Sequence, residues 1–141
     1  MKDWQRPFKI LPVGKGRKLK DGKDIVVVSI GPIGNIAREA IEKAKLSGVD
    51  AAHYDMIYLK PIDEELLHEI GKNYKRVVTV ENGTTQGGLG TAVMEFMSEN
   101  NYSPEVVRIG IPDEFIPHGT IPELYKLCGM DVDSIAEVLQ K

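Results

Sequence analysis

The chain has 141 residues, of which 42% are hydrophobic and 28% are charged, with a formal net charge of −3. This is the composition of an ordinary globular domain, and the length is sufficient for one hydrophobic core. No apolar run approaches the roughly 20 residues that would span a bilayer, and the N-terminus lacks the apolar block of a secretory signal, so we expect a cytoplasmic protein without a membrane partner.

The charge is distributed unevenly along the chain. Residues 1–23 hold eight Lys/Arg against two Asp, whereas residues 24–141 hold ten Lys/Arg against nineteen Asp/Glu. A basic leader can indicate nucleic-acid binding, but this one lacks interleaved aromatic residues. Residues 20–23, Lys-Asp-Gly-Lys, are typical of a turn between two strands. We therefore expect no nucleic-acid partner.

Residues 1–13 are predicted to form an arm or linker that precedes a domain at 14–141. Two prolines interrupt regular structure in this segment. Trp4 and Phe8 are too apolar for a free tail. We expect the arm to pack against this domain or against a neighbouring one.

Strands and helices alternate along the rest of the chain. The predicted strands are 17–20, 24–30, 49–58, 76–80 and 105–109, and the predicted helices are 33–48, 61–71, 88–100, a short one after Thr120, and 132–139. Residues 24–30 are a near-continuous β-branched run, typical of a strand covered on both faces. The alternation predicts an α/β fold, a three-layer α/β/α sandwich with a mostly parallel sheet of about five strands and one antiparallel edge strand.

A glycine-rich turn follows the predicted strand at 76–80 and its terminal acid, Glu81. Gly87, Gly88 and Gly90 do not match the dinucleotide fingerprint, and no P-loop lysine follows them. Glycines before a helix are compatible with an anion site at exposed amide groups, or with a tight turn packed against a partner backbone. The structural interpretation is favoured, and the anion site stays an alternative.

The loop 110–120 leaves the last predicted strand and also ends at a helix start. Both loops should emerge at the carboxyl ends of parallel strands, where open α/β sheets place their binding surfaces. Phe115 and His118 are therefore candidate contacts to a partner or an anion. Glu81 is either a general base or a buried acceptor for loop amides; the second is favoured because no cation or histidine lies nearby in sequence.

A complete catalytic set is not found. The sequence has no paired cysteines, no H-x-x-x-H, no calcium loop and no nucleophile elbow, so no catalytic, cofactor-binding or metal-binding residue is assigned. His53 and His68 are isolated, and ligand roles for them are not favoured. Cys128 cannot form an internal disulfide and is expected to be a buried structural thiol.

Several sequence segments, in this order, resemble the C-terminal domain of the transketolase-like thiamine diphosphate enzymes. They are LPVGKG at 11–16, DIVVVSIGPIGNIAREA at 24–40, DMIYLKPID at 55–63, VTVENGTTQGGLGTAV at 78–93 and IGIPDEFIPHGT at 109–120. The first and the last resemble, more narrowly, the 1-deoxy-D-xylulose-5-phosphate synthases.

The resemblance implies a structural and dimerisation domain that is not catalytic alone. In such enzymes thiamine diphosphate and Mg²⁺ are held by other domains, so no cofactor is expected in this chain. The implied partners are those domains or a separate thiamine-diphosphate-binding subunit, and a homodimer is expected. The sequence leaves open whether the chain is an excised domain or a natural split subunit. The alternatives are the C-terminal domain of a transketolase or of a 2-oxo-acid dehydrogenase β subunit, and a free-standing anion-binding α/β module.

Overall fold

The computed structural model describes residues 10–141, so the expectations for Trp4 and Phe8 lie outside the described residues. The elements in chain order are β1 (Arg17–Lys20), β2 (Ile25–Ile30), α1 (Gly34–Lys45), β3 (Ala51–Asp55), α2 (Glu64–Asn73), β4 (Arg76–Thr84), α3 (Leu89–Glu99), β5 (Glu105–Ile111), α4 (Ile121–Leu127) and α5 (Val132–Leu139). Every predicted element is present. In the described part of the chain, no helix has both the length and the apolar character to cross a bilayer.

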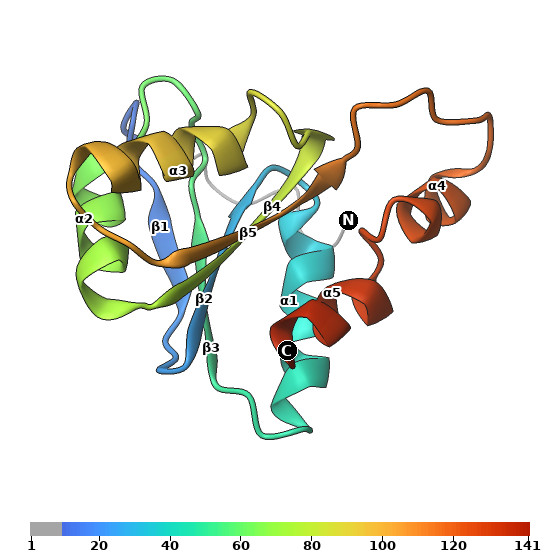
Figure 1. Cartoon of the computed structure of the whole chain (residues 1–141), viewed down its shortest axis with the longest axis horizontal. Coiled ribbons are helices and arrows are strands. Elements are labelled where there is room, and N and C mark those ends of the chain that lie inside the picture. The colour runs from blue at the N-terminus through green and yellow to red at the C-terminus, as the bar shows by residue number, and fades with distance from the viewer. Residues whose placement is uncertain (1–9) are drawn as a thin grey trace.

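The strands form one sheet in the order β1-β3-β2-β4-β5 (Figure 1). The pairs β3–β2, β2–β4 and β4–β5 are parallel, and β1 runs antiparallel to β3 at the edge. This confirms the predicted sheet. Because its parallel strands point the same way, the loops after β2, β3, β4 and β5 leave the sheet at one end.

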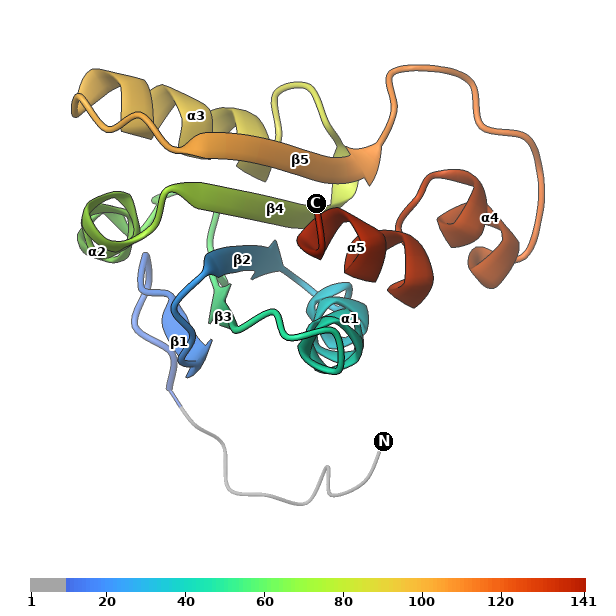
Figure 2. The same ribbon diagram turned by 60° about the horizontal axis from the view of Figure 1, so that its bottom comes forward.

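Helices cover both faces of the sheet, which gives the predicted three-layer sandwich (Figure 2). One core lies between the sheet and α1 with α5, and the other between the sheet and α2 with α3. Along β2, Ile25 and Val27 enter the first core, and Val26 and Val28 enter the second. All four are almost completely buried. A strand with two buried faces needs no polar alternation, which explains the unbroken apolar run in its sequence.

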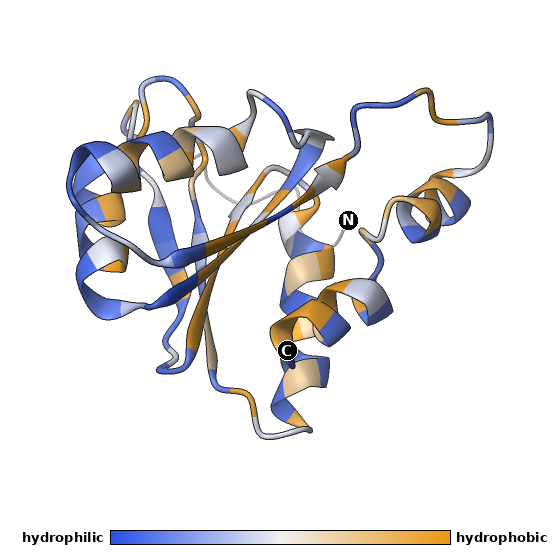
Figure 3. Cartoon of the chain, viewed as in Figure 1, coloured by the Kyte–Doolittle hydropathy of each residue, from blue (hydrophilic) through white to orange (hydrophobic). Residues whose placement is uncertain are grey.

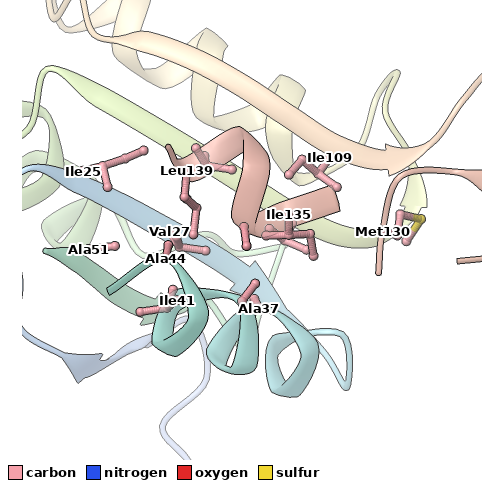
Figure 4. Close-up of a cluster of buried hydrophobic side chains, with 14 of the residues drawn as sticks. Ile25, Val27, Ala37, Ile41, Ala44, Ala51, Ile109, Met130, Ile135 and Leu139 are labelled. Atoms are coloured by element: carbon pink, nitrogen blue, oxygen red, sulfur yellow. The ribbon is translucent and has the colours of Figure 1, made fainter. Parts of the chain in front are cut away.

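Small side chains let α1 lie close to its neighbours. Ala37, Ala40 and Ala44 are buried on the face of α1 that packs in the first core. Ile135 and Leu139 of α5 enter the same core, as Figure 4 shows. Figure 3 shows the corresponding hydrophobic stripes on the helices and the hydrophobic central strands. The helical spacing of apolar residues therefore predicted these two faces correctly.

Strands β3, β4 and β5 differ in length from the sequence-based expectation by two residues or more. Strand β4 continues to Thr84 and β5 to Ile111, and these two residues pair beyond an irregularity that follows Val80. Backbone pairing does not require apolar side chains, so Glu81 still pairs with Ile30 of β2 and Thr84 with Ile111 of β5. Strand β3 is shorter and ends at Asp55, close to Ile57, which has a φ of 58°. A positive φ is incompatible with extended strand geometry.

Basic residues of β1 form ion pairs with acidic residues. Arg17 Nη2 lies 2.8 Å from Asp55 Oδ2, and Lys18 Nζ lies 2.7 Å from an oxygen of Glu69. Each pair joins the edge strand to the body of the domain. These cations are therefore compensated locally.

A polar pair interrupts the apolar faces of β2 and β3. Ser29 and His53 are each 1% exposed, and the Ser29 Oγ to His53 Nε2 distance is 2.8 Å. Desolvation lowers the pKa of His53 from 6.5 to about 4; Asp55 opposes this shift, while the charges of Arg38 and Lys20 add to it. His53 is thus neutral in the folded protein at pH 7.

This neutral histidine predicts a loss of stability in mild acid. The unfolded chain binds a proton at His53 below about pH 6.5, whereas the folded chain binds it only near pH 4. The free energy of unfolding should therefore fall by about 2 kcal/mol between pH 7.5 and pH 5. Urea unfolding at both pH values checks this. The double variant Ser29→Ala/His53→Leu removes both partners, and an unchanged pH dependence in that variant would contradict the assignment.

Candidate functional site

Glu81 closes the N-terminus of α3. Its side chain is buried, and its two oxygens accept hydrogen bonds from the backbone N–H groups of Leu89 (2.9 Å) and Gly90 (3.0 Å). These are the first residues of α3, whose N–H groups have no acceptor within the helix. Gly88 at the N-cap has no side chain to supply one. The carboxylate of Glu81 therefore acts as the cap and places a negative charge at the positive end of the helix.

Two glycines of the turn leave room for neighbouring side chains, among them this carboxylate. A Cβ on Gly88 would collide with the Glu81 oxygens, and a Cβ on Gly90 would lie 2.7 Å from Thr79 Oγ1. Gly87 has open space around it but a φ of 77°, which side chains rarely adopt. Close packing at two positions and backbone conformation at the third thus explain the glycine pattern.

Hydrogen bonds join the glycine turn to the last strand. The N–H of Thr85 donates to Ile111 O (2.9 Å), and Arg108 Nη1 donates to Thr85 O (2.7 Å). The N–H of Gly87 donates to Thr91 Oγ1 (3.0 Å). The turn and the loop after β5 are therefore neighbours at their bases, at the end of the sheet to which the parallel strands point (Figure 2).

The loop from 112 to 120 presents an apolar side chain to solvent. Phe115 is fully exposed and His118 is also exposed. No hydrogen bond joins His118 to Glu81 or to any other residue of the described part of the chain. The loop ends in a capping box, in which the N–H and Oγ1 of Thr120 donate to Glu123 Oε2 at 2.9 and 2.6 Å. These hydrogen bonds lower the pKa of Glu123.

An apolar cavity of about 250 Å³ lies between this loop, the ends of β4 and β5, and α4. It is lined by Asn82, Ile111, Ile116, Ile121, Leu124, Tyr125, Cys128 and Met130. Cys128 is half-buried at the C-terminal cap of α4, less enclosed than the buried thiol we expected. The sequence feature that could have indicated this cavity is the spacing of apolar residues in α4. From sequence alone, however, a helix as short as α4 does not reveal which element its apolar residues pack against.

A second hollow joins two separate sequence motifs. It has a volume of about 330 Å³ and is lined by Leu59, Lys60, Gly87, Gly88, Thr91, Ala92 and Glu95. Leu59 and Lys60 belong to the DMIYLKPID segment, whereas the other residues belong to the glycine turn and α3. The two segments are far apart in sequence and adjacent in the fold, a juxtaposition that sequence reasoning did not detect.

The sequence-derived candidates therefore form two groups. Glu81 and the three glycines meet at the start of α3, and Phe115 and His118 lie on the loop after β5. The first group is engaged within the domain, because both oxygens of Glu81 already accept helix amides. The second group faces outward. Among residues 10–141 no three metal-ligating side chains of His, Cys, Asp or Glu come together.

Comparisons with known proteins agree with this architecture. The family described as transketolase, C-terminal domain, matches residues 14–135. The chain belongs to the family of transketolase C-terminal domains.

Within that family, the similar curated proteins are 1-deoxy-D-xylulose-5-phosphate synthases. The chain is 68% identical to the one from Azobacteroides pseudotrichonymphae genomovar. CFP2 over 99% of its length, and 64% identical to the one from Parabacteroides distasonis over 100%. It spans only 22% of the length of each of these relatives.

A solved structure has the same fold. It is described as a split gene transketolase, an inactive beta4 tetramer, and it superimposes with a TM-score of 0.86 at 37% identity. The superposition covers 92% of this chain and 42% of the other.

Proposed function

We propose that this chain is the C-terminal, scaffolding domain of a 1-deoxy-D-xylulose-5-phosphate synthase, in which it contacts other domains and a second subunit. The observation that carries the proposal is the loop 112–120, whose Phe115 is fully exposed beside an apolar cavity. Exposed aromatic residues at pockets are typical anchors of protein interfaces. The names of the similar curated proteins, of which this chain spans 22%, support the assignment to such an enzyme.

The proposed reaction is the condensation of pyruvate with glyceraldehyde 3-phosphate, with its chemistry located outside this chain. Bound to the other domains, thiamine diphosphate would supply the electron sink for decarboxylation. The described residues do not fit a site for thiamine diphosphate and Mg²⁺. The carboxylate of Glu81 already accepts the hydrogen bonds that cap α3. Among residues 10–141 no group of three metal-ligating side chains comes together.

The proposal includes a domain at 14–141, a linker at 1–13, a homodimer and a cytoplasmic location. The family match begins at residue 14, which supports the boundary. Ile10 and Val13 are 91% and 73% exposed, as expected for a linker that packs on a neighbouring domain. The homodimer agrees with the general prevalence of two-fold symmetric homodimers among soluble oligomers.

The two alternatives are less well supported. A free-standing anion-binding module would need the amides at the start of α3, but the carboxylate of Glu81 occupies them. A transketolase or 2-oxo-acid dehydrogenase origin is disfavoured by relatives of 68% and 64% identity that are 1-deoxy-D-xylulose-5-phosphate synthases.

The direct test of the proposed function is an activity assay of the 141-residue chain with thiamine diphosphate, Mg²⁺, pyruvate and glyceraldehyde 3-phosphate. No turnover is expected from the chain alone. The complete enzyme that contains it should form 1-deoxy-D-xylulose 5-phosphate. Turnover by the isolated chain would overturn the scaffolding role, and an inactive complete enzyme would overturn the reaction.

Phe115→Ser in the complete enzyme tests the interface. We expect the activity to fall roughly tenfold through weaker domain or subunit contact, since a truncated aromatic anchor typically costs more than 1 kcal/mol. The thermal stability of the isolated 141-residue chain should not change, because the ring is fully exposed there. Leu46→Ser, at an 89% exposed residue after α1, is the matched control. Equal effects of the two substitutions would contradict an interface at the loop.

A further inference from the structure

A polar cavity lies on the α1 face of the sheet, at the carboxyl ends of β2 and β3 and beside the start of α1. Its volume is about 210 Å³. Its lining residues are Arg17, Leu19, Ser29, Gly31, Gly34, Asn35, Arg38, His53 and Asp55. The cavity is separate from the loop 112–120 and from the glycine turn, so it is not part of the site described above.

The buried polar residues of the cavity have no structural task that explains them. Elsewhere, Asp63 caps α2 and Glu81 caps α3. Ser29 and His53, by contrast, bond only to one another and, weakly, to the carbonyl of Tyr54. Within residues 10–141 the His53 ring bonds through Nε2, and its other nitrogen, Nδ1, is not among the fully enclosed atoms that lack a partner. Because His53 lines the cavity, a bound group that accepts a hydrogen bond can pair with this nitrogen there.

The cavity carries an excess of positive charge. Asp55 is neutralised, because its Oδ2 accepts from Arg17 Nε at 3.0 Å and from Nη2 at 2.8 Å. Its Oδ1 accepts from the N–H of Ile57 at 3.2 Å. Arg38, in contrast, forms no ion pair or hydrogen bond with the residues that the structure describes. One uncompensated guanidinium therefore borders the cavity.

The first turn of α1 adds to this positive potential. It contains no acidic residue, and Ile33 at the N-cap has no side chain that can accept a hydrogen bond. The other long helices differ, because Asp63 caps α2, Glu81 caps α3 and Asp131 caps α5. The N–H groups of Gly34 and Asn35 donate to Gly31 O and Pro32 O, each at 3.1 Å, so the start of α1 contributes its dipole, rather than free amides, beside Arg38 and His53.

We propose that this cavity binds a phosphate group, either as the free ion or on a small phosphorylated metabolite. Arg38 would pair with the phosphate oxygens, His53 Nδ1 would donate a hydrogen bond, and the start of α1 would stabilise the charge. With the proton of the neutral His53 ring on Nδ1, its Nε2 accepts a hydrogen bond from Ser29 Oγ, in agreement with the 2.8 Å distance between these two atoms. Phosphate binding in this cavity requires neither thiamine diphosphate nor another domain, so its test is independent of the test of the proposed function.

The test is a titration of the 141-residue chain with inorganic phosphate at pH 7, followed by NMR. The resonances of the His53 ring nitrogens and of the amides of Gly34 and Asn35 should shift and saturate. Glycerol 3-phosphate as second titrant distinguishes the sources: tighter binding than inorganic phosphate indicates a metabolite, and equal binding indicates the free ion. Acetate should not compete, and equally tight acetate binding would contradict a phosphate site.

Arg38→Gln should weaken phosphate binding roughly tenfold or more, and Arg38→Lys should keep part of the affinity. Both substitutions are at an exposed side chain and should leave the fold intact. Lys45→Gln, in the last turn of the same helix, removes one charge at the opposite end and should not matter. The proposal is overturned if the shifts do not saturate, or if Arg38→Gln and Lys45→Gln lower the affinity equally.

Discussion

Replacing Glu81 with Ala is expected to lower the free energy of unfolding by about 3 kcal/mol. The substitution removes two charge-assisted hydrogen bonds and leaves the N–H groups of Leu89 and Gly90 buried without an acceptor. Glu81→Gln should cost less, because an amide oxygen still satisfies one of the two donors. Urea unfolding followed by circular dichroism measures both losses.

Asp131→Ala is the matched control for this prediction. Asp131 is also a helix cap, but it is partly exposed and accepts from one N–H, that of Ser134, at 3.1 Å. Water can replace the lost acceptor there, so we expect a cost of about 1 kcal/mol. If Glu81→Ala cost no more than Asp131→Ala, the cap would not be the buried structural element that the geometry indicates. A Glu81→Ala chain that keeps its stability would reopen a functional role for this carboxylate.

Gly88→Ala is expected to destabilise the chain by about 3 kcal/mol, as overpacking combines with a displaced cap. The added Cβ would occupy the space of the Glu81 carboxylate. The Glu81→Ala background provides the decisive comparison, because it removes the colliding group. There, Gly88→Ala should cost less than about 1 kcal/mol, and the double-mutant cycle should give a strong coupling energy.

Gly87→Ala separates collision from backbone strain. A Cβ at Gly87 meets no atom within 4 Å, so only the φ of 77° opposes it. The expected cost is about 1 kcal/mol, and it should be the same with and without Glu81. If Gly88→Ala showed the same independence of Glu81, the explanation of the glycine pattern would be wrong.

These two expectations bear on function as well as stability. The strand end of an open α/β sheet is the usual place for a reactive group, and here its acid is used to close a helix. The loop with Phe115 at the same end is open to solvent and is suited to contact rather than to chemistry. The structural use of Glu81 and the exposure of the loop with Phe115 together support the proposed scaffolding role.

Much of the fold could be predicted from local patterns. The apolar spacing of α1 and α5 predicted their buried faces, and the unbroken run in β2 predicted a strand covered on both sides. Cap residues mark element ends, as the capping box of Thr120 and Glu123 does at the start of α4. Such signals are readable because they depend on neighbours a few residues apart.

The ends of the strands were harder to predict. Residues 81–84 are polar or glycine, yet they remain in β4 because Glu81 pairs with Ile30 of β2 and Thr84 pairs with Ile111 of β5. His53 and Asp55 looked like interruptions of a strand and lie within it. Which side chains meet across a sheet depends on register, which a single sequence does not specify.

The sequence by itself determined the class of fold and the order of its elements, because those depend on local periodicity and turn chemistry. Only the tertiary structure decided that Glu81 caps α3 and that Ser29 meets His53 at a cavity below Arg38. Those contacts join segments brought together by parallel crossovers, and their register and distances arise only when both faces of the sheet are packed.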